Sequence, residues 1–171
     1  MAEPPSPAPD ALPSETRIGH VHLTVSDLER SLRFYRDVLG FHETGRLGDS
    51  AVFLAAGDYH HHIALNTWAG KGAPRPAPGT TGLFHVAIVV PSRRDLAVLL
   101  RRLHAQGWPL EGAADHGPTE SLYLRDPDGN GVEVYADRPK DQWPRDAEGR
   151  IAERVAPLDL EDLLREAEGP H

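Results

Sequence analysis

The chain of 171 residues contains no cysteine and only one methionine. The absence of cysteine excludes disulfides, thiolate nucleophiles and cysteine-based zinc or iron–sulfur sites. A metal bound by this protein must therefore sit on imidazole and carboxylate ligands. The sequence has ten histidines, so the places where they fall along the chain are informative.

An excess of basic charge and long apolar runs are also missing. The formal net charge is −8, which would repel a phosphate backbone, so we predict no nucleic-acid partner. No apolar run approaches the roughly 20 residues of a membrane-spanning helix, and residues 1–13 lack the basic and apolar regions of a signal peptide. The composition, 39% hydrophobic and 26% charged, is that of an ordinary globular protein. We expect a cytoplasmic protein without a membrane partner.

Two segments rich in proline and small residues divide the chain. Residues 1–16 are predicted to form a disordered arm, and residues 69–82 have the same composition. They leave two modules, about 17–68 and 82–137, inside a domain that spans 17–137. The remaining residues, 138–171, form a C-terminal extension. Its leucines, Leu158, Leu160, Leu163 and Leu164, predict a short helix that docks on the domain or on a second subunit.

The two modules have the same order of predicted elements. Each opens with a strand that carries a histidine, at 18–25 and 83–90, followed by a helix that ends near Gly40 or Gly107. Capping-box patterns mark the two helix starts, with Ser26 before Glu29 and Ser92 before Asp95. Three further strands follow in each module, at about 41–47, 51–56 and 60–67, then 108–114, 119–125 and 131–136. The sequence therefore predicts an α+β fold of two βαβββ modules, which form a curved mixed sheet around a metal-binding cavity.

Strand alternation gathers three possible ligands on one face of this sheet. His20, His22 and Thr24 alternate with apolar residues in the first strand. His85 opens the equivalent strand of the second module, and Glu133 lies between two valines in the last strand. Two imidazoles and one carboxylate are the ligands of a facial triad that leaves metal positions open. We therefore predict a divalent metal bound by His20, His85 and Glu133.

The sequence resembles the vicinal-oxygen-chelate superfamily over about residues 17–137. The segment 27–35 (DLERSLRFY) with 38–41 (VLGF) is similar to the first helix of that family, and 126–133 (DPDGNGVE) is similar to its closing hairpin. The resemblance implies that the ligand positions of the family fall on His20, His85 and Glu133. Glyoxalase I in this superfamily uses a further ligand at the place of Ile63 or Ala64, neither of which binds a metal.

Within the superfamily the chain most resembles catechol-cleaving extradiol dioxygenases. The resemblance rests on the histidines at 60–62, on His116-Gly117 and on Tyr123. It implies iron(II), with manganese(II) as the alternative and zinc or nickel less favoured, and a catechol-like aromatic substrate with O₂. It also implies that His61 acts as acid and base, while His116 and Tyr123 steady the ring oxygens. Other readings are an isomerase or resistance transferase of the same superfamily, or a drug-binding resistance protein.

Two points stay open in the sequence. Family matching favours His61 in the cavity, whereas alternation places His62 there with Ala64 and Asn66. We take His61 as catalytic, and His22, His62 and Asn66 as substrate contacts. Many extradiol dioxygenases also have two paired-module domains, whereas this chain resembles one. A homodimer would replace the missing half.

Overall fold

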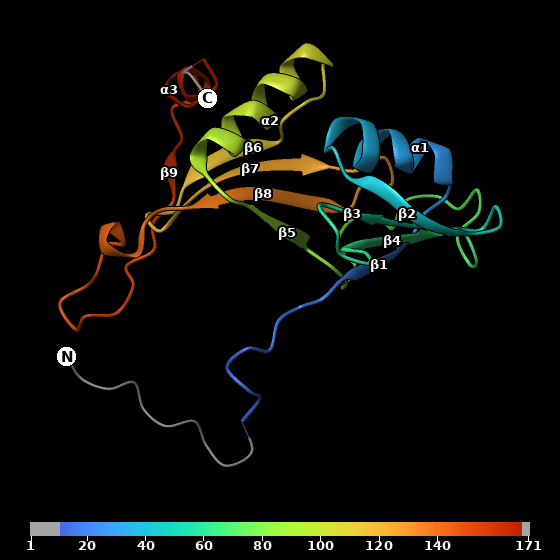
Figure 1. Ribbon diagram of the computed structural model, residues 1–171, viewed down its shortest axis with the longest axis horizontal. Coiled ribbons are helices and arrows are strands. Elements are labelled where there is room, and N and C mark those ends of the chain that lie inside the picture. The colour runs from blue at the N-terminus through green and yellow to red at the C-terminus, as the bar shows by residue number, and fades with distance from the viewer. Residues whose placement is uncertain (1–10, 169–171) are drawn as a thin grey trace.

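The computed structural model describes residues 11–168, and most of the predicted N-terminal arm lies outside this range. It contains two modules of equal element order (Figure 1). The first comprises β1 (Val21–Thr24), α1 (Leu28–Leu32), its π-helical continuation η1 (Arg33–Val38), β2 (His42–Leu47), β3 (Ala51–Ala55) and β4 (Ile63–Asn66). The second comprises β5 (His85–Val90), α2 (Arg93–Ala105), β6 (Gly112–Asp115), β7 (Thr119–Arg125) and β8 (Gly131–Asp137). The extension adds η2 (Lys140–Gln142), β9 (Ala156–Pro157) and α3 (Leu160–Glu166).

The strands form two mixed sheets, with the orders β1-β4-β3-β2 and β5-β8-β7-β6-β9. The pairs β1–β4 and β5–β8 are parallel, and the others are antiparallel. The predicted α+β fold of two βαβββ modules is confirmed. The two sheets lie side by side (Figure 1), but within residues 11–168 no ladder joins β1 to β5. Each of these two strands is therefore an edge of its own sheet.

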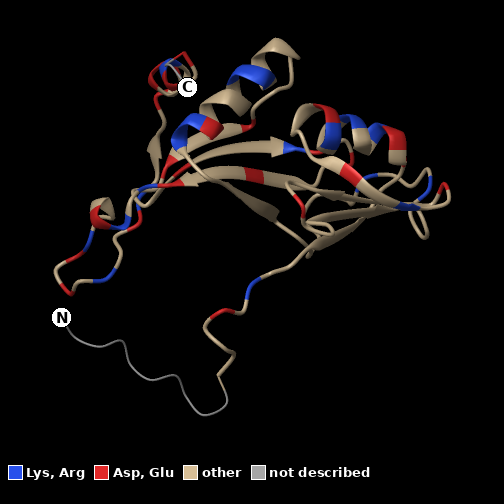
Figure 2. Ribbon diagram, viewed as in Figure 1, with Lys and Arg blue, Asp and Glu red and all other residues tan. Residues whose placement is uncertain are grey.

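Helices cover one face of each sheet, which explains the alternation along the strands (Figure 1). In β1, Leu23 is buried and His22 is exposed, and His20 just before the strand is exposed as well. In β8, Val132 and Val134 are buried, whereas Glu133 between them reaches the opposite face. Predicted ligands and core residues thus lie on opposite faces. Most charged side chains lie on the helices and the C-terminal segment, while the strands are largely uncharged (Figure 2).

The two helix starts differ from each other. The Ser92 side chain caps α2 by accepting from the Asp95 N–H at 3.2 Å, as predicted. At α1 the cap is Asp27, one residue after the predicted Ser26. The Ser26 hydroxyl instead donates to Asp128 of the second module at 2.6 Å. A charged acceptor makes the stronger hydrogen bond, which explains why the predicted capping box is wrong here.

The predicted strand over 60–67 begins only at Ile63. Because Ile63 pairs with Leu54 in the β3–β4 ladder, the intervening residues form the connection between these two strands. Gly57 has a φ of 65°, a conformation that favours glycine and marks the turn. His60, His61 and His62 therefore lie on a loop, where strand alternation does not decide which of them faces the site.

The C-terminal extension folds back onto the second module. Strand β9 pairs with β6, and α3 packs against α2 with Leu163 fully buried (Figure 1). The predicted short helix thus docks on its own domain. Across residues 11–168, none of the helices combines the length and the apolar character needed to cross a membrane.

Candidate active site

Two of the three predicted metal ligands are adjacent in the structure. His85 opens β5, and Glu133 lies in the neighbouring strand β8, opposite Ala87 in the parallel ladder. Because residues two apart in a strand share a face, both side chains lie on the same side of the sheet. His85 Nε2 is 3.0 Å from Glu133 Oε2, and both groups are partly buried.

Gly131 allows β8 to approach β5 closely at this point. It pairs with His85, and a Cβ atom built on it would contact the Phe84 carbonyl oxygen and the Cβ of His85. Any side chain at this position would push the two strands apart. The glycine two residues before Glu133 therefore helps to set the His85–Glu133 distance.

Tyr123 and His116 extend this pair into a line of polar contacts. Tyr123 lies opposite Glu133 in the β7–β8 ladder, and its hydroxyl is 3.2 Å from Glu133 Oε1. His116 Nε2 lies 2.6 Å from the same hydroxyl. Burial raises the pKa of Tyr123, and the Glu133 carboxylate raises it further. Tyr123 is therefore protonated at neutral pH and can donate a hydrogen bond.

The remaining predicted residues lie in the first module. The rings of His20 and His61 are 4.5 Å apart, and Nδ1 of His61 is 2.9 Å from Nδ1 of His60. Burial lowers the pKa of His61, and the neighbouring imidazoles, His20 first among them, lower it further. Of the three loop histidines, His61 is thus the one placed beside a predicted ligand.

The predicted substrate contacts fall in two places. His22 Nε2 is 3.0 Å from Asn66 Nδ2, on the side of β1 that also carries His20. Asn66 is buried, and its side-chain oxygen accepts from the Trp68 N–H, so its orientation is fixed. His62 instead lines a cavity of about 530 Å³ with Phe41, Ile63 and residues of β5 and α2. His62 and Asn66 therefore do not share one surface.

The third predicted ligand lies apart from the other two. Within residues 11–168, no three histidine, aspartate or glutamate side chains are close enough together to hold a metal ion. His20 lines the 530 Å³ cavity between the two modules, whereas neither His85 nor Glu133 is among the residues that line it. The His85–Glu133 pair offers nitrogen and oxygen donors that suit iron or manganese. A complete triad therefore requires that His20 comes within ligand distance of the same metal as His85 and Glu133.

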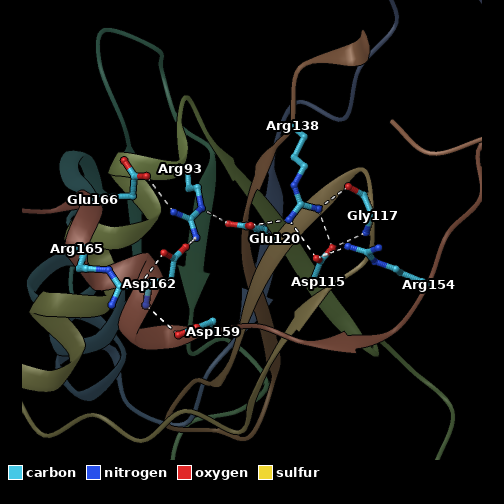
Figure 3. A network of polar contacts seen from close by, with 10 residues as sticks. All are labelled: Arg93, Asp115, Gly117, Glu120, Arg138, Arg154, Asp159, Asp162, Arg165 and Glu166. Carbon is cyan, nitrogen blue, oxygen red and sulfur yellow. Dashed lines mark hydrogen bonds and ion pairs between the residues drawn. The ribbon is translucent and has the colours of Figure 1, made fainter. Parts of the chain in front are cut away.

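A cluster of charged residues beside His116 was not predicted from the sequence (Figure 3). Asp115 binds Arg138 and Arg154 at 2.7 and 2.5 Å, and Arg138 also binds the buried Glu120 at 2.6 Å. Arg138 is the main reason that the pKa of Asp115 lies far below its usual range. The only sequence signal was the position of Asp115 next to a predicted site histidine, since the two arginines lie in the extension.

Residues 17–134 match the Glyoxalase/Bleomycin resistance protein/Dioxygenase superfamily. The chain belongs to this superfamily. It is 40% identical over 153 residues to a catechol-2,3-dioxygenase of Bacillus subtilis, covering 90% of this chain and 53% of that protein. It is 37% identical over 121 residues to biphenyl-2,3-diol 1,2-dioxygenase 3 of Rhodococcus globerulus, covering 71% of this chain and 63% of the relative.

Solved structures of superfamily members share the fold. A glyoxalase/bleomycin resistance protein/dioxygenase domain from Frankia is 29% identical, with a TM-score of 0.61 over 74% of this chain and 96% of that one. The chain spans between half and two thirds of the length of these Bacillus and Rhodococcus dioxygenases. It therefore corresponds to part of each of those proteins, and their activities come to it only as a proposal.

Proposed function

We propose that this protein is a metal-dependent extradiol-type dioxygenase that cleaves a catechol-like aromatic ring with O₂. The line of contacts from Glu133 through Tyr123 to His116 carries the proposal, because it joins a ligand pair to hydrogen-bonding groups. A substrate with two adjacent hydroxyl groups offers two oxygens that can bind a metal. It also offers protons that hydrogen-bonding side chains of the protein can accept. The similarity to a catechol-2,3-dioxygenase and to a biphenyl-2,3-diol 1,2-dioxygenase supports the same conclusion.

The metal is proposed to be iron(II), or manganese(II), held by His85 and Glu133 with His20 as the third ligand. When bound, it supplies the Lewis acidity and the electron transfer that insertion of dioxygen requires. His61 receives a proton from the substrate hydroxyl, since it is the loop histidine beside His20. Tyr123 contacts a ring oxygen through its hydroxyl, and His116 holds that hydroxyl in place from 2.6 Å. His22 and Asn66 contact the substrate from the side of β1.

Oxygen uptake by metal-reconstituted protein tests this function. The protein would be loaded with iron(II) or manganese(II) under argon and mixed with catechol and 2,3-dihydroxybiphenyl in an oxygen electrode. We expect one O₂ consumed per substrate, with both atoms of ¹⁸O₂ found in the product. His85→Ala should be inactive, whereas His104→Ala, which replaces an exposed histidine of α2, should be unaffected.

Two results would contradict the proposal. Conversion that needs nickel or zinc but no oxygen would assign the protein to the isomerases or transferases of the superfamily. Tight binding of an aromatic compound that a chelator does not change, without turnover, would identify a drug-binding protein.

We also propose that the protein is a homodimer. Four large apolar side chains near the free edges of β1 and β5 are exposed, namely Ile18 (93%), Phe84 (82%), Leu83 (54%) and Val89 (54%). Unpaired strand edges and exposed apolar residues are costly in a monomer, and a second copy of the chain would cover both.

Light scattering should give twice the mass of the chain. Ile18→Glu should lower that mass, whereas Val155→Glu, at an exposed valine of the extension, should not. A monomeric wild-type protein would contradict this proposal.

A further inference from the structure

His116 is held by a residue that lies outside both modules. The Arg154 N–H donates to the His116 carbonyl oxygen at 3.0 Å, and the Arg154 carbonyl oxygen is 3.0 Å from His116 Nδ1. Two residues later, Ala156 of β9 pairs with Asp115 of β6. One residue of the C-terminal extension therefore binds both the backbone and the ring of a predicted site histidine.

This contact determines which ring nitrogen carries the proton. A backbone carbonyl only accepts hydrogen bonds, so Nδ1 of His116 must be the donor to Arg154. In the neutral ring Nε2 is then unprotonated, and it lies 2.6 Å from the Tyr123 hydroxyl. Because an unprotonated Nε2 can only accept, the single Tyr123 proton is shared between His116 at 2.6 Å and Glu133 Oε1 at 3.2 Å, and the shorter contact favours His116. The extension thus fixes both the ring orientation and the direction of the hydrogen bond.

An ion pair holds Arg154 in place. Its guanidinium donates to Asp115 Oδ2 at 2.5 Å, while Asp115 Oδ1 accepts from the Gly117 N–H at 2.7 Å (Figure 3). Asp115 precedes His116 directly, so this carboxylate joins the loop around His116 to the extension. Gly117 has a φ of 93°, and a Cβ atom on it would lie 2.7 Å from Pro144 Cγ. The extension therefore packs against the loop that carries His116.

The ion pair belongs to a larger network that reaches α3. Arg138 joins Asp115 to Glu120, and Arg93 of α2 joins Glu120 to Asp162 at 2.6 and 2.7 Å (Figure 3). Glu120 is only 6% exposed, so its charge needs both arginines. The network attaches Arg138 and α3 to β6, β7 and α2 at once, whereas Arg154 is held by its ion pair with Asp115.

We propose that Arg154 is a positioning residue, which holds His116 in one orientation with its proton on Nδ1 and its Nε2 directed at Tyr123. This inference rests on the proposed function for its effect on catalysis. The tautomer itself does not depend on that function. The extension would then be part of the active-site support and not only a dimer surface or a linker.

The test combines a tautomer measurement with kinetics. In metal-free protein, ¹⁵N NMR of the side chain, assigned by the signal lost in His116→Gln, should show the proton of His116 on Nδ1. Arg154→Ala should give a mixture of tautomers, because the carbonyl is no longer anchored through Asp115. With iron(II) and catechol, kcat should fall about 10-fold, while KM and metal content stay the same. Arg154→Lys keeps a charged partner for Asp115 and should restore most of both properties.

Arg150→Ala provides the matched control. Arg150 lies in the same extension and pairs with Asp146 and Glu148 but not with Asp115, so both measurements should match the wild type. A single Nδ1 tautomer in Arg154→Ala, or the Nε2 tautomer in the wild type, would overturn the inference. Because the NMR measurement needs no turnover, it remains decisive if the protein proves inactive towards catechols.

Discussion

Glutamine in place of Glu133 is expected to weaken metal binding by at least about 100-fold and to abolish oxygen uptake with catechol. The carboxylate is partly buried and faces His85 Nε2 at 3.0 Å, so the two groups form a ready pair of donors. Glutamine has the same shape but lacks the charge that draws a divalent cation, and its amide nitrogen is no ligand. The fold should be unchanged, since the substitution leaves the β5–β8 ladder intact.

Metal content by mass spectrometry, together with titration of iron(II) into metal-free protein, would measure the effect. Glu111→Gln is the matched control, because Glu111 is an exposed glutamate that pairs with Arg125. Metal affinity equal to that of the wild type in Glu133→Gln would show that the ligands lie elsewhere. A parallel loss in His20→Ala would show that the first module reaches the same metal.

The fold could be predicted because its signals are local and occur twice. Each module has a histidine-bearing strand, a capped amphipathic helix and three further strands. The alternation of apolar and polar residues along β1 and β8 distinguished the side chains that pack in the core from those that face the site. The sequence could not tell whether β1 and β5 would pair, because pairing of edge strands depends on long-range geometry. The prediction that Ser26 caps the first helix was also wrong, because its hydrogen-bond partner, Asp128, lies 102 positions further along the chain.

The site could be predicted in part for the same reason. His85, Glu133 and Tyr123 come from adjacent strands of one module, where register places them side by side, and His116 lies in the turn just before the strand of Tyr123. His60, His61 and His62 could not be oriented by alternation, because they lie in a connection and not in a strand. Arg138 and Arg154 had no visible role, since the leucines of the extension predict a docked helix but not the pairing of β9 with β6.

Removal of the Asp126 carboxylate is expected to lower the free energy of unfolding by about 3 kcal/mol. Asp126 is 1% exposed and lies in the turn between β7 and β8. It accepts from the Tyr35 hydroxyl at 3.0 Å, from the backbone N–H of Asp128 at 2.9 Å and from the backbone and side chain of Asn130. Asp126→Ala would leave these buried donors without a partner, which costs more than the loss of one hydrogen bond.

The effect should exceed that of Tyr35→Phe, which removes one of the donors and should cost about 1 kcal/mol. Burial, and then Asp126, raise the pKa of Tyr35 far above its usual range, so its hydroxyl remains a donor at any working pH. The turn also carries Asp128, which binds Ser26 and Arg30 of the first module at 2.6 and 2.5 Å. If urea unfolding shows Asp126→Ala to be no less stable than Asp49→Ala, at an exposed loop position, this turn does not join the modules. A large loss in Asp126→Ala together with a smaller one in Tyr35→Phe would show that the turn between β7 and β8 also joins the two modules, because Tyr35 is the partner of Asp126 in the first module.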